Sequence, residues 1–92
     1  MTTEKLYKRL GKLLDRSDDA DKKHIKKLRE VLKALKKRQR ELEDQLKHTK
    51  GAHERRNLQH DIDVLSLQRK KGVEVYKNLK LERAAKKNKT DD

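Results

Sequence analysis

The chain has 92 residues and a formal net charge of +12, with 48% charged and 30% hydrophobic residues. This hydrophobic fraction is well below the roughly 45–50% of ordinary globular domains, so it favours a single domain of long helices, in which a narrow apolar stripe suffices. The lack of Cys excludes disulfides and Cys-based zinc sites, and no apolar run approaches the roughly 18 residues of a membrane span. We therefore expect an all-α cytoplasmic protein without a membrane partner.

The first predicted helix covers about residues 3–16. Its apolar positions recur at the spacing of one helix face: Leu6, Leu10, Leu13 and Leu14. Thr2 or Thr3 can cap this helix, because a hydroxyl oxygen accepts a hydrogen bond from a free N–H of the first turn. The polar stretch after it predicts a break at residues 17–19 and a new helix capped by Ser17 or Asp18.

The second predicted helix covers about residues 19–49 and contains the clearest periodicity in the chain. Positions spaced alternately by three and four residues form the seam of a coiled coil: Ile25, Leu28, Leu32, Leu35, Gln39, Leu42, Leu46 and Thr49. Gly51 follows this seam. A glycine can adopt the left-handed conformation that ends many helices, so we expect the chain to turn at Gly51.

The third predicted helix covers about residues 52–83. Its seam continues the same spacing: Leu58, Ile62, Leu65, Arg69, Gly72, Tyr76 and Leu79. Residues 84–92 contain no apolar stripe to bury, which predicts a disordered tail and one helical domain over residues 1–83.

Two heptad helices joined by a glycine turn predict an antiparallel coiled-coil hairpin with a short N-terminal helix. Folding about residue 50 pairs residues whose numbers sum to about 100. Leu35 then faces Leu65, and Gly72 lies opposite Leu28. Because the core of one hairpin is thin, we expect a homodimeric bundle. The alternative is a single rod of about 60 residues that also dimerises, since a glycine within a helix costs only about 1 kcal/mol.

The positive charge is concentrated in two segments. Residues 22–40 contain ten basic residues and one acidic residue, and residues 64–89 contain nine basic and two acidic. In a hairpin these segments meet at the end away from the turn. The predicted nucleic-acid-binding residues on the second helix form a ridge opposite its leucine seam: Lys22, Lys26, Arg29, Lys33, Lys36, Lys37 and Arg40. Arg69, Lys70 and Lys77 join them from the third helix. The alternative is an ordinary solvated face of a coiled coil.

Residues 48–58, HTKGAHERRNL, resemble the helix-connecting HKKDHHSRR-type stretch of a small helical ribosomal protein that binds rRNA. The resemblance covers about a dozen residues. It implies RNA-backbone contacts by residues around the turn: His48, His53, Arg55 and Arg56. Without RNA, Arg55 would cover Leu46 with its aliphatic part.

These patterns predict a binding protein and not an enzyme, with no cofactor and no metal. His48, His53 and His60 do not share a spacing at which they would converge on a metal ion. The predicted function is binding to the backbone of duplex DNA or structured RNA, because exposed aromatic rings for single strands are scarce. The alternative is a coiled-coil adaptor or inhibitor that docks on an acidic protein partner, with Tyr7 as an apolar anchor.

Overall fold

A computed structural model describes residues 2–15 and 21–90, with the backbone alone for residues 85–90. Over these ranges it contains three helices and no strand: α1 (Thr3–Asp15), α2 (Lys22–His48) and α3 (Ala52–Thr90). The all-α prediction is therefore confirmed. None of the helices in the described ranges combines the length and the apolar character that crossing a bilayer requires.

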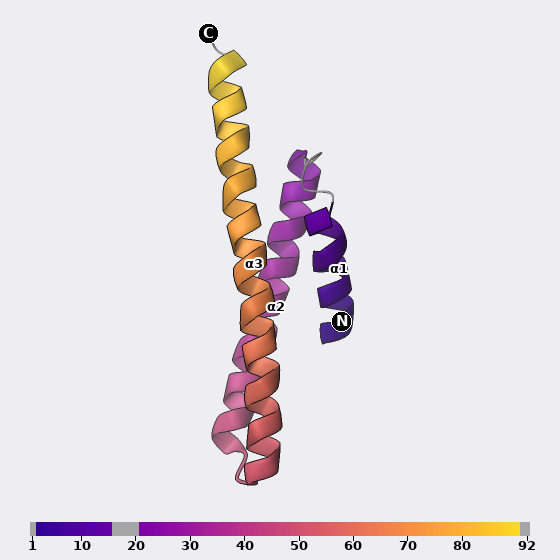
Figure 1. The fold of residues 1–92 in the computed structure, drawn as a ribbon, viewed down its shortest axis with the longest axis vertical. Helices are drawn as coiled ribbons and strands as arrows, with labels where there is room; N and C mark the ends of the chain where they lie inside the picture. Colours follow the sequence, from indigo (N-terminus) through magenta and orange to yellow (C-terminus); the bar gives the residue numbers. More distant parts are fainter. Residues whose placement is uncertain (1, 16–20, 91–92) are drawn as a thin grey trace.

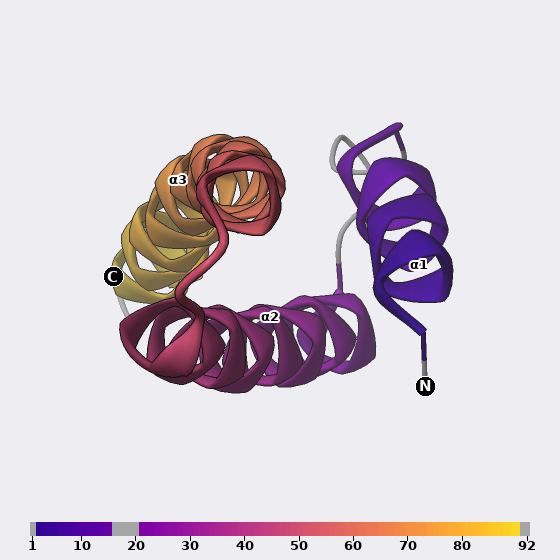
Figure 2. The same cartoon turned by 90° about the horizontal axis from the view of Figure 1, so that it is seen from below.

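The helices are arranged with α2 in the central position. The chain turns back after α2, so that α3 lies alongside it, and α1 lies against the N-terminal half of α2 (Figure 1). Viewed along the long axis, α1 and α3 both lie on one side of α2 and leave its other side uncovered (Figure 2). This uncovered side decides which basic residues remain accessible.

The starts of α1 and α2 follow from local hydrogen bonding. Thr2 caps α1, with its hydroxyl oxygen accepting from the Lys5 backbone N–H at 3.3 Å. Asp21 caps α2, with Oδ1 accepting from the His24 backbone N–H at 2.8 Å. This hydrogen bond is the main reason why the pKa of the Asp21 carboxyl is lowered from its usual value. The predicted caps Ser17 and Asp18 lie outside the described residues.

The turn between α2 and α3 is built differently from the prediction. No glycine in the described ranges has a positive φ angle. The prediction of a left-handed conformation at Gly51 is therefore wrong. The C-cap of α2 is Thr49, whose N–H donates to the Leu46 carbonyl at 3.4 Å and whose hydroxyl donates to the Gln45 carbonyl at 2.6 Å. The Gly51 carbonyl instead accepts from the Arg55 N–H at 2.9 Å, at the start of α3.

The end of α3 also differs from the prediction. The helix continues to Thr90, seven residues beyond the expected end at residue 83 and through most of the expected tail over 84–92. Residues 82–87, ERAAKK, are strong helix formers, and neither Gly nor Pro interrupts them. Extending an existing helix adds one hydrogen bond per residue, which favours continuation of the helix through this stretch.

The core consists of aliphatic side chains from all three helices. Its buried members are Leu6, Leu10, Ile25, Leu28, Val31, Leu32, Leu35, Leu42, Ile62, Leu65 and Leu79. Leu28, Leu35 and Leu65 have no exposed surface, which places them at the centre of the packing between α2 and α3. The α1 residues Leu6 and Leu10 are buried as well, so α1 completes a core that two helices alone would leave open.

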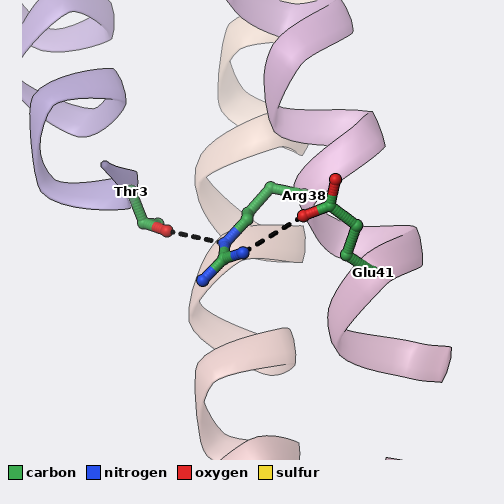
Figure 3. A network of polar contacts seen from close by, with 3 residues as sticks. All are labelled: Thr3, Arg38 and Glu41. Atoms are coloured by element: carbon green, nitrogen blue, oxygen red, sulfur yellow. Dashed lines mark hydrogen bonds and ion pairs between the residues drawn. The ribbon is translucent and has the colours of Figure 1, made fainter. Parts of the chain in front are cut away.

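Polar contacts hold α1 at both ends. Near its start, Arg38 Nε donates to Thr3 Oγ1 at 3.1 Å, while Arg38 Nη1 donates to Glu41 Oε2 at 3.1 Å (Figure 3). Near its end, His24 Nε2 lies 2.7 Å from the Leu13 carbonyl oxygen. These contacts fix α1 along α2 and engage Arg38, which therefore does not contribute a free cation to the surface.

At Gly72, side chains of α1 and α2 lie close against the backbone of α3. A Cβ atom at Gly72 would lie 2.6 Å from Leu32 Cδ2 and 3.0 Å from Leu10 Cδ1. The close approach expected at this glycine therefore exists, but its nearest neighbours are Leu32 and Leu10 in place of the predicted Leu28. Leu32 lies one turn further along α2, and Leu10 comes from α1, whose position the heptad pattern does not specify.

Adding a methyl group at the two helical glycines should have opposite effects. Gly72→Ala should destabilise the protein by about 1 kcal/mol, because overpacking costs about 1–3 kcal/mol and helix propensity returns about 1 kcal/mol. Gly11→Ala should stabilise it by about 0.5–1 kcal/mol, because nothing lies within 4 Å of a Cβ there. Urea denaturation measures both, and shifts of the same sign would contradict this packing.

Candidate nucleic-acid interface

The predicted ridge residues of α2 share one exposed face. We define the α2 ridge as Lys22, Lys26, Arg29, Lys33, Lys36, Lys37 and Arg40, all of which are exposed. At 3.6 residues per turn, these seven positions fall within an arc of about 100°. The buried residues of α2 fall largely on the opposite arc, towards α1 and α3. The ridge therefore lies on the side of α2 that Figure 2 shows uncovered.

The ridge is an electrostatically unsatisfied surface within the described ranges. The close contacts there between basic and acidic side chains are the Arg38–Glu41 ion pair, at 3.1 Å, and the contact of the His48 ring with Asp44, at 3.8 Å, and neither includes a ridge residue. Like charges three and four residues apart on a helix repel by roughly 0.2–0.5 kcal/mol per pair. A bound anion would relieve this repulsion along the full ridge, which is about 27 Å long at 1.5 Å per residue.

The predicted residues of α3 divide into two groups. Lys70 and Lys77 are exposed. Arg69 is half-buried, and its Nη1 donates to Gln39 Oε1 at 3.3 Å, so it links α3 to α2. We therefore assign Arg69 a role in helix pairing and exclude it from the candidate surface.

Two basic residues of α3 near the start of α2 were not predicted from the sequence as part of a site. Lys80 and Arg83 line one cleft together with Lys22. In a hairpin whose paired residue numbers sum to about 100, residues 78–80 lie beside residues 20–22. The position of Lys80 beside Lys22 could therefore have been predicted from the sequence. The cleft lies at the end of the α2–α3 pair away from the Thr49–Gly51 turn, and we call this end the open end.

The basic residues at the turn have different surroundings. The Arg55 guanidinium donates through Nη1 to the carbonyls of Leu46 and Thr49, each at 2.9 Å. Both acceptors lie at the C-terminal end of α2, where the Leu46 carbonyl also accepts from the Thr49 N–H, so Arg55 has a capping function in the chain itself. Arg56 is exposed.

The histidines near the turn contact residues of their own helices. His48 Nε2 lies 3.8 Å from Asp44 Oδ1, and His53 Nε2 lies 3.5 Å from Asn57 Nδ2. Within residues 2–15 and 21–90, no three His, Asp or Glu side chains gather closely enough to hold a metal ion.

Tyr7, the apolar anchor of the adaptor hypothesis, is half-buried. Burial, and secondly the negative charge of Asp61, raise the pKa of the Tyr7 hydroxyl. The ring belongs to a groove that residues of α1, α2 and α3 line together, so it contributes to holding α1 in place. Among the residues whose side chains the structure describes, the exposed large apolar ones are instead Leu67 and Leu81 on α3, with 58% and 69% of their surface accessible.

The arrangement presents a row of cations in which five of the seven are lysines and two, Arg29 and Arg40, are arginines that could also contact guanine edges. Lys and Arg spaced by three and four residues can neutralise successive phosphates, and the α2 ridge contains no Asn or Gln that could pair with an adenine edge. Its length corresponds to the axial rise of about eight base pairs at 3.4 Å each.

Comparison of the chain with protein-family models, curated proteins and solved structures gives no match.

Proposed function

We propose that the protein binds the phosphate backbone of duplex DNA or structured RNA through the α2 ridge, with Lys70 and Lys77 of α3 as additional contacts. One observation carries this proposal: seven exposed cations lie on the side of α2 that neither α1 nor α3 covers. A surface of mixed positive and negative charges would keep the protein equally soluble. A surface with positive charges alone is destabilised by repulsion between them, but it attracts polyanions.

The residue types favour backbone contacts over sequence reading. Lys outnumbers Arg on the ridge, and a lysine ammonium attracts phosphate as a point charge without the bidentate geometry that reads guanine. The aromatic residues of the chain, Tyr7 and Tyr76, are both half-buried, which disfavours base stacking with single strands. Affinity should therefore depend on duplex structure and charge, with little dependence on base sequence.

We further propose that α2 and α3 form an antiparallel coiled-coil hairpin that associates as a homodimer. The complete burial of Leu35 and Leu65 supports the hairpin, because each occupies a seam position of its helix. Exposed Leu67 and Leu81, with half-buried Val64 and Val75, support a second helix packed on the outside of α3. The second candidate function is docking on an acidic protein: the exposed leucines would anchor the partner, and the net charge of +12 would attract its acidic surface.

Fluorescence anisotropy with labelled probes tests the function. At about 50 mM salt, where electrostatic binding is strong, two 20-base-pair DNA duplexes of unrelated sequence should bind alike, as should an RNA duplex. A single-stranded oligothymidine of equal length should bind more weakly. Polyglutamate of matched charge supplies the control. If it competes as effectively as duplex DNA, the acidic-protein function replaces the proposed one, and the same follows if no duplex binds.

A further inference from the structure

The face of α3 that points away from α2 contains a second row of residues with coiled-coil spacing. Its members are spaced by three and four residues in turn: Val64, Leu67, Lys71, Glu74, Asn78 and Leu81. Each of them lies two residues after a member of the α3 seam, and two residues correspond to a rotation of about 200° around the helix. This outer row therefore lies nearly opposite to the packing between α2 and α3.

The outer row is accessible along most of its length. Leu67 and Leu81 are exposed, as are the three polar members between them, and Val64 is half-buried. Apolar residues at both ends of a row with this spacing are typical of a helix that packs against another helix. The polar members in the middle of the row then decide which helix fits.

The charges in the middle of the outer row favour a second copy of the same helix. Lys71 and Glu74 are both exposed, and within the described ranges neither takes part in an ion pair. An acidic partner would attract Lys71 but repel Glu74. A copy of α3 that runs in the opposite direction sets Lys71 against the partner's Glu74, and Glu74 against the partner's Lys71. Because a two-fold axis repeats every contact, this arrangement forms two ion pairs.

The same antiparallel pairing also matches the ends of the outer row. It places Val64 against the partner's Leu81, and Leu67 beside the partner's Asn78. A shift of one heptad in either direction sets Lys71 against a leucine of the partner and loses both ion pairs. A parallel pair would bring the two Asn78 side chains together, which is one favourable contact. It would also set lysine against lysine and glutamate against glutamate, which are two unfavourable ones.

We propose that two copies of the protein associate through their outer rows as an antiparallel pair of α3 helices, with two ion pairs between Lys71 and Glu74 at its centre. This proposal rests on the homodimer proposed above and adds the contact surface, the direction and the register. The contact between Val64 and Leu81 is about 26 Å long at 1.5 Å per residue. It belongs to α3 alone, so the α2 ridge stays accessible and each dimer carries two ridges.

Disulfide cross-linking tests the register, because the chain contains no cysteine of its own. Leu67→Cys and Asn78→Cys each introduce one thiol at an exposed position, and the two variants are mixed in a glutathione redox buffer. A disulfide requires Cα atoms within about 7 Å, whereas residue 67 lies about 16 Å along the helix from its own counterpart in the antiparallel pair. The mixed disulfide should therefore exceed each self-disulfide about tenfold or more. An excess of the Leu67→Cys self-disulfide, or random proportions of the three disulfides, would overturn the proposal.

Charge variants test the two ion pairs by sedimentation equilibrium. Lys71→Glu should weaken dimerisation about tenfold or more, because like charges then meet across the contact. Adding Glu74→Lys to this variant restores opposite charges and should return the affinity to within about threefold of the original. Lys33→Glu makes the same charge change on the α2 ridge and should alter dimerisation less than about threefold. A failure of Glu74→Lys to rescue Lys71→Glu would also contradict the proposal.

Sedimentation of the unchanged chain separates this contact from the homodimer itself. A monomer at about 100 µM would overturn both, whereas a dimer without a preference for the mixed disulfide would overturn only the contact proposed here. Lys33→Glu with Lys37→Glu should weaken duplex binding but leave the mixed disulfide unchanged, so the nucleic-acid surface and the dimer contact can fail independently.

Discussion

Replacing Leu35 with Ala is expected to destabilise the protein by about 3–5 kcal/mol, the upper part of the range for buried leucines. Leu35 has no exposed surface and lies in the same buried cluster as Leu65, so truncation leaves a cavity between α2 and α3. Domains of this size have a total stability of roughly 5–15 kcal/mol, and each kcal/mol corresponds to about 4–8 °C in Tm. Thermal unfolding followed by circular dichroism should therefore show a fall in Tm of at least about 12 °C.

The matched control for this variant is Leu81→Ala. It makes the same chemical change on α3, at a side chain with 69% of its surface exposed. Its effect should stay within about 0.5 kcal/mol, as for other surface substitutions, when both variants are measured at concentrations too low for the chains to associate. Equal effects of the two variants would contradict the packing of α2 against α3.

The second large effect is expected from Lys33→Glu with Lys37→Glu on the α2 ridge. The logarithm of the affinity for B-DNA falls by about 0.9 per phosphate contact for each tenfold rise in salt. By that relation, losing two contacts at 0.1 M salt weakens binding roughly 60-fold, and the reversed charges weaken it further. The loss should be equal for duplexes of different sequence, because backbone contacts carry no base information.

A charge-matched control distinguishes the ridge from net charge. Lys50→Glu with Arg56→Glu changes the charge by the same amount at the turn, where both side chains are exposed. We avoid Arg55 in this control because its guanidinium caps α2, so its loss would also affect stability. Anisotropy titrations should show a much smaller effect of this pair. A larger effect at the turn than on the ridge would move the binding site to residues 48–58.

The helices themselves could be predicted because their signals are local and repeated. The leucine spacing from Ile25 to Leu46 requires only that one face of a helix be buried, and α3 starts at Ala52 as expected. The role of Gly51 could not be predicted in this way. Helix termination depends on which groups reach the free carbonyls, and Thr49 and Arg55 satisfy them without a left-handed residue.

Contacts between distant segments were less predictable. Pairing of the two seams anticipated that Gly72 allows close approach, but the position of α1 depends on how Leu6 and Leu10 fit between α2 and α3. The ridge was readable from sequence because all its members belong to one helix, so a helical wheel fixes their common face. The cleft formed by Lys22, Lys80 and Arg83 requires two helices to be correctly aligned, and it was missed.

The salt dependence of binding to a 20-base-pair DNA duplex tests the central claim most directly. Titrations between about 50 and 300 mM KCl, with affinity plotted against salt on logarithmic axes, give the number of phosphates neutralised. If five to seven ridge and α3 side chains contact the backbone, the slope should lie at about −4 to −6. A slope near zero, or no binding at the lowest salt, would contradict the claim that this surface binds nucleic acid.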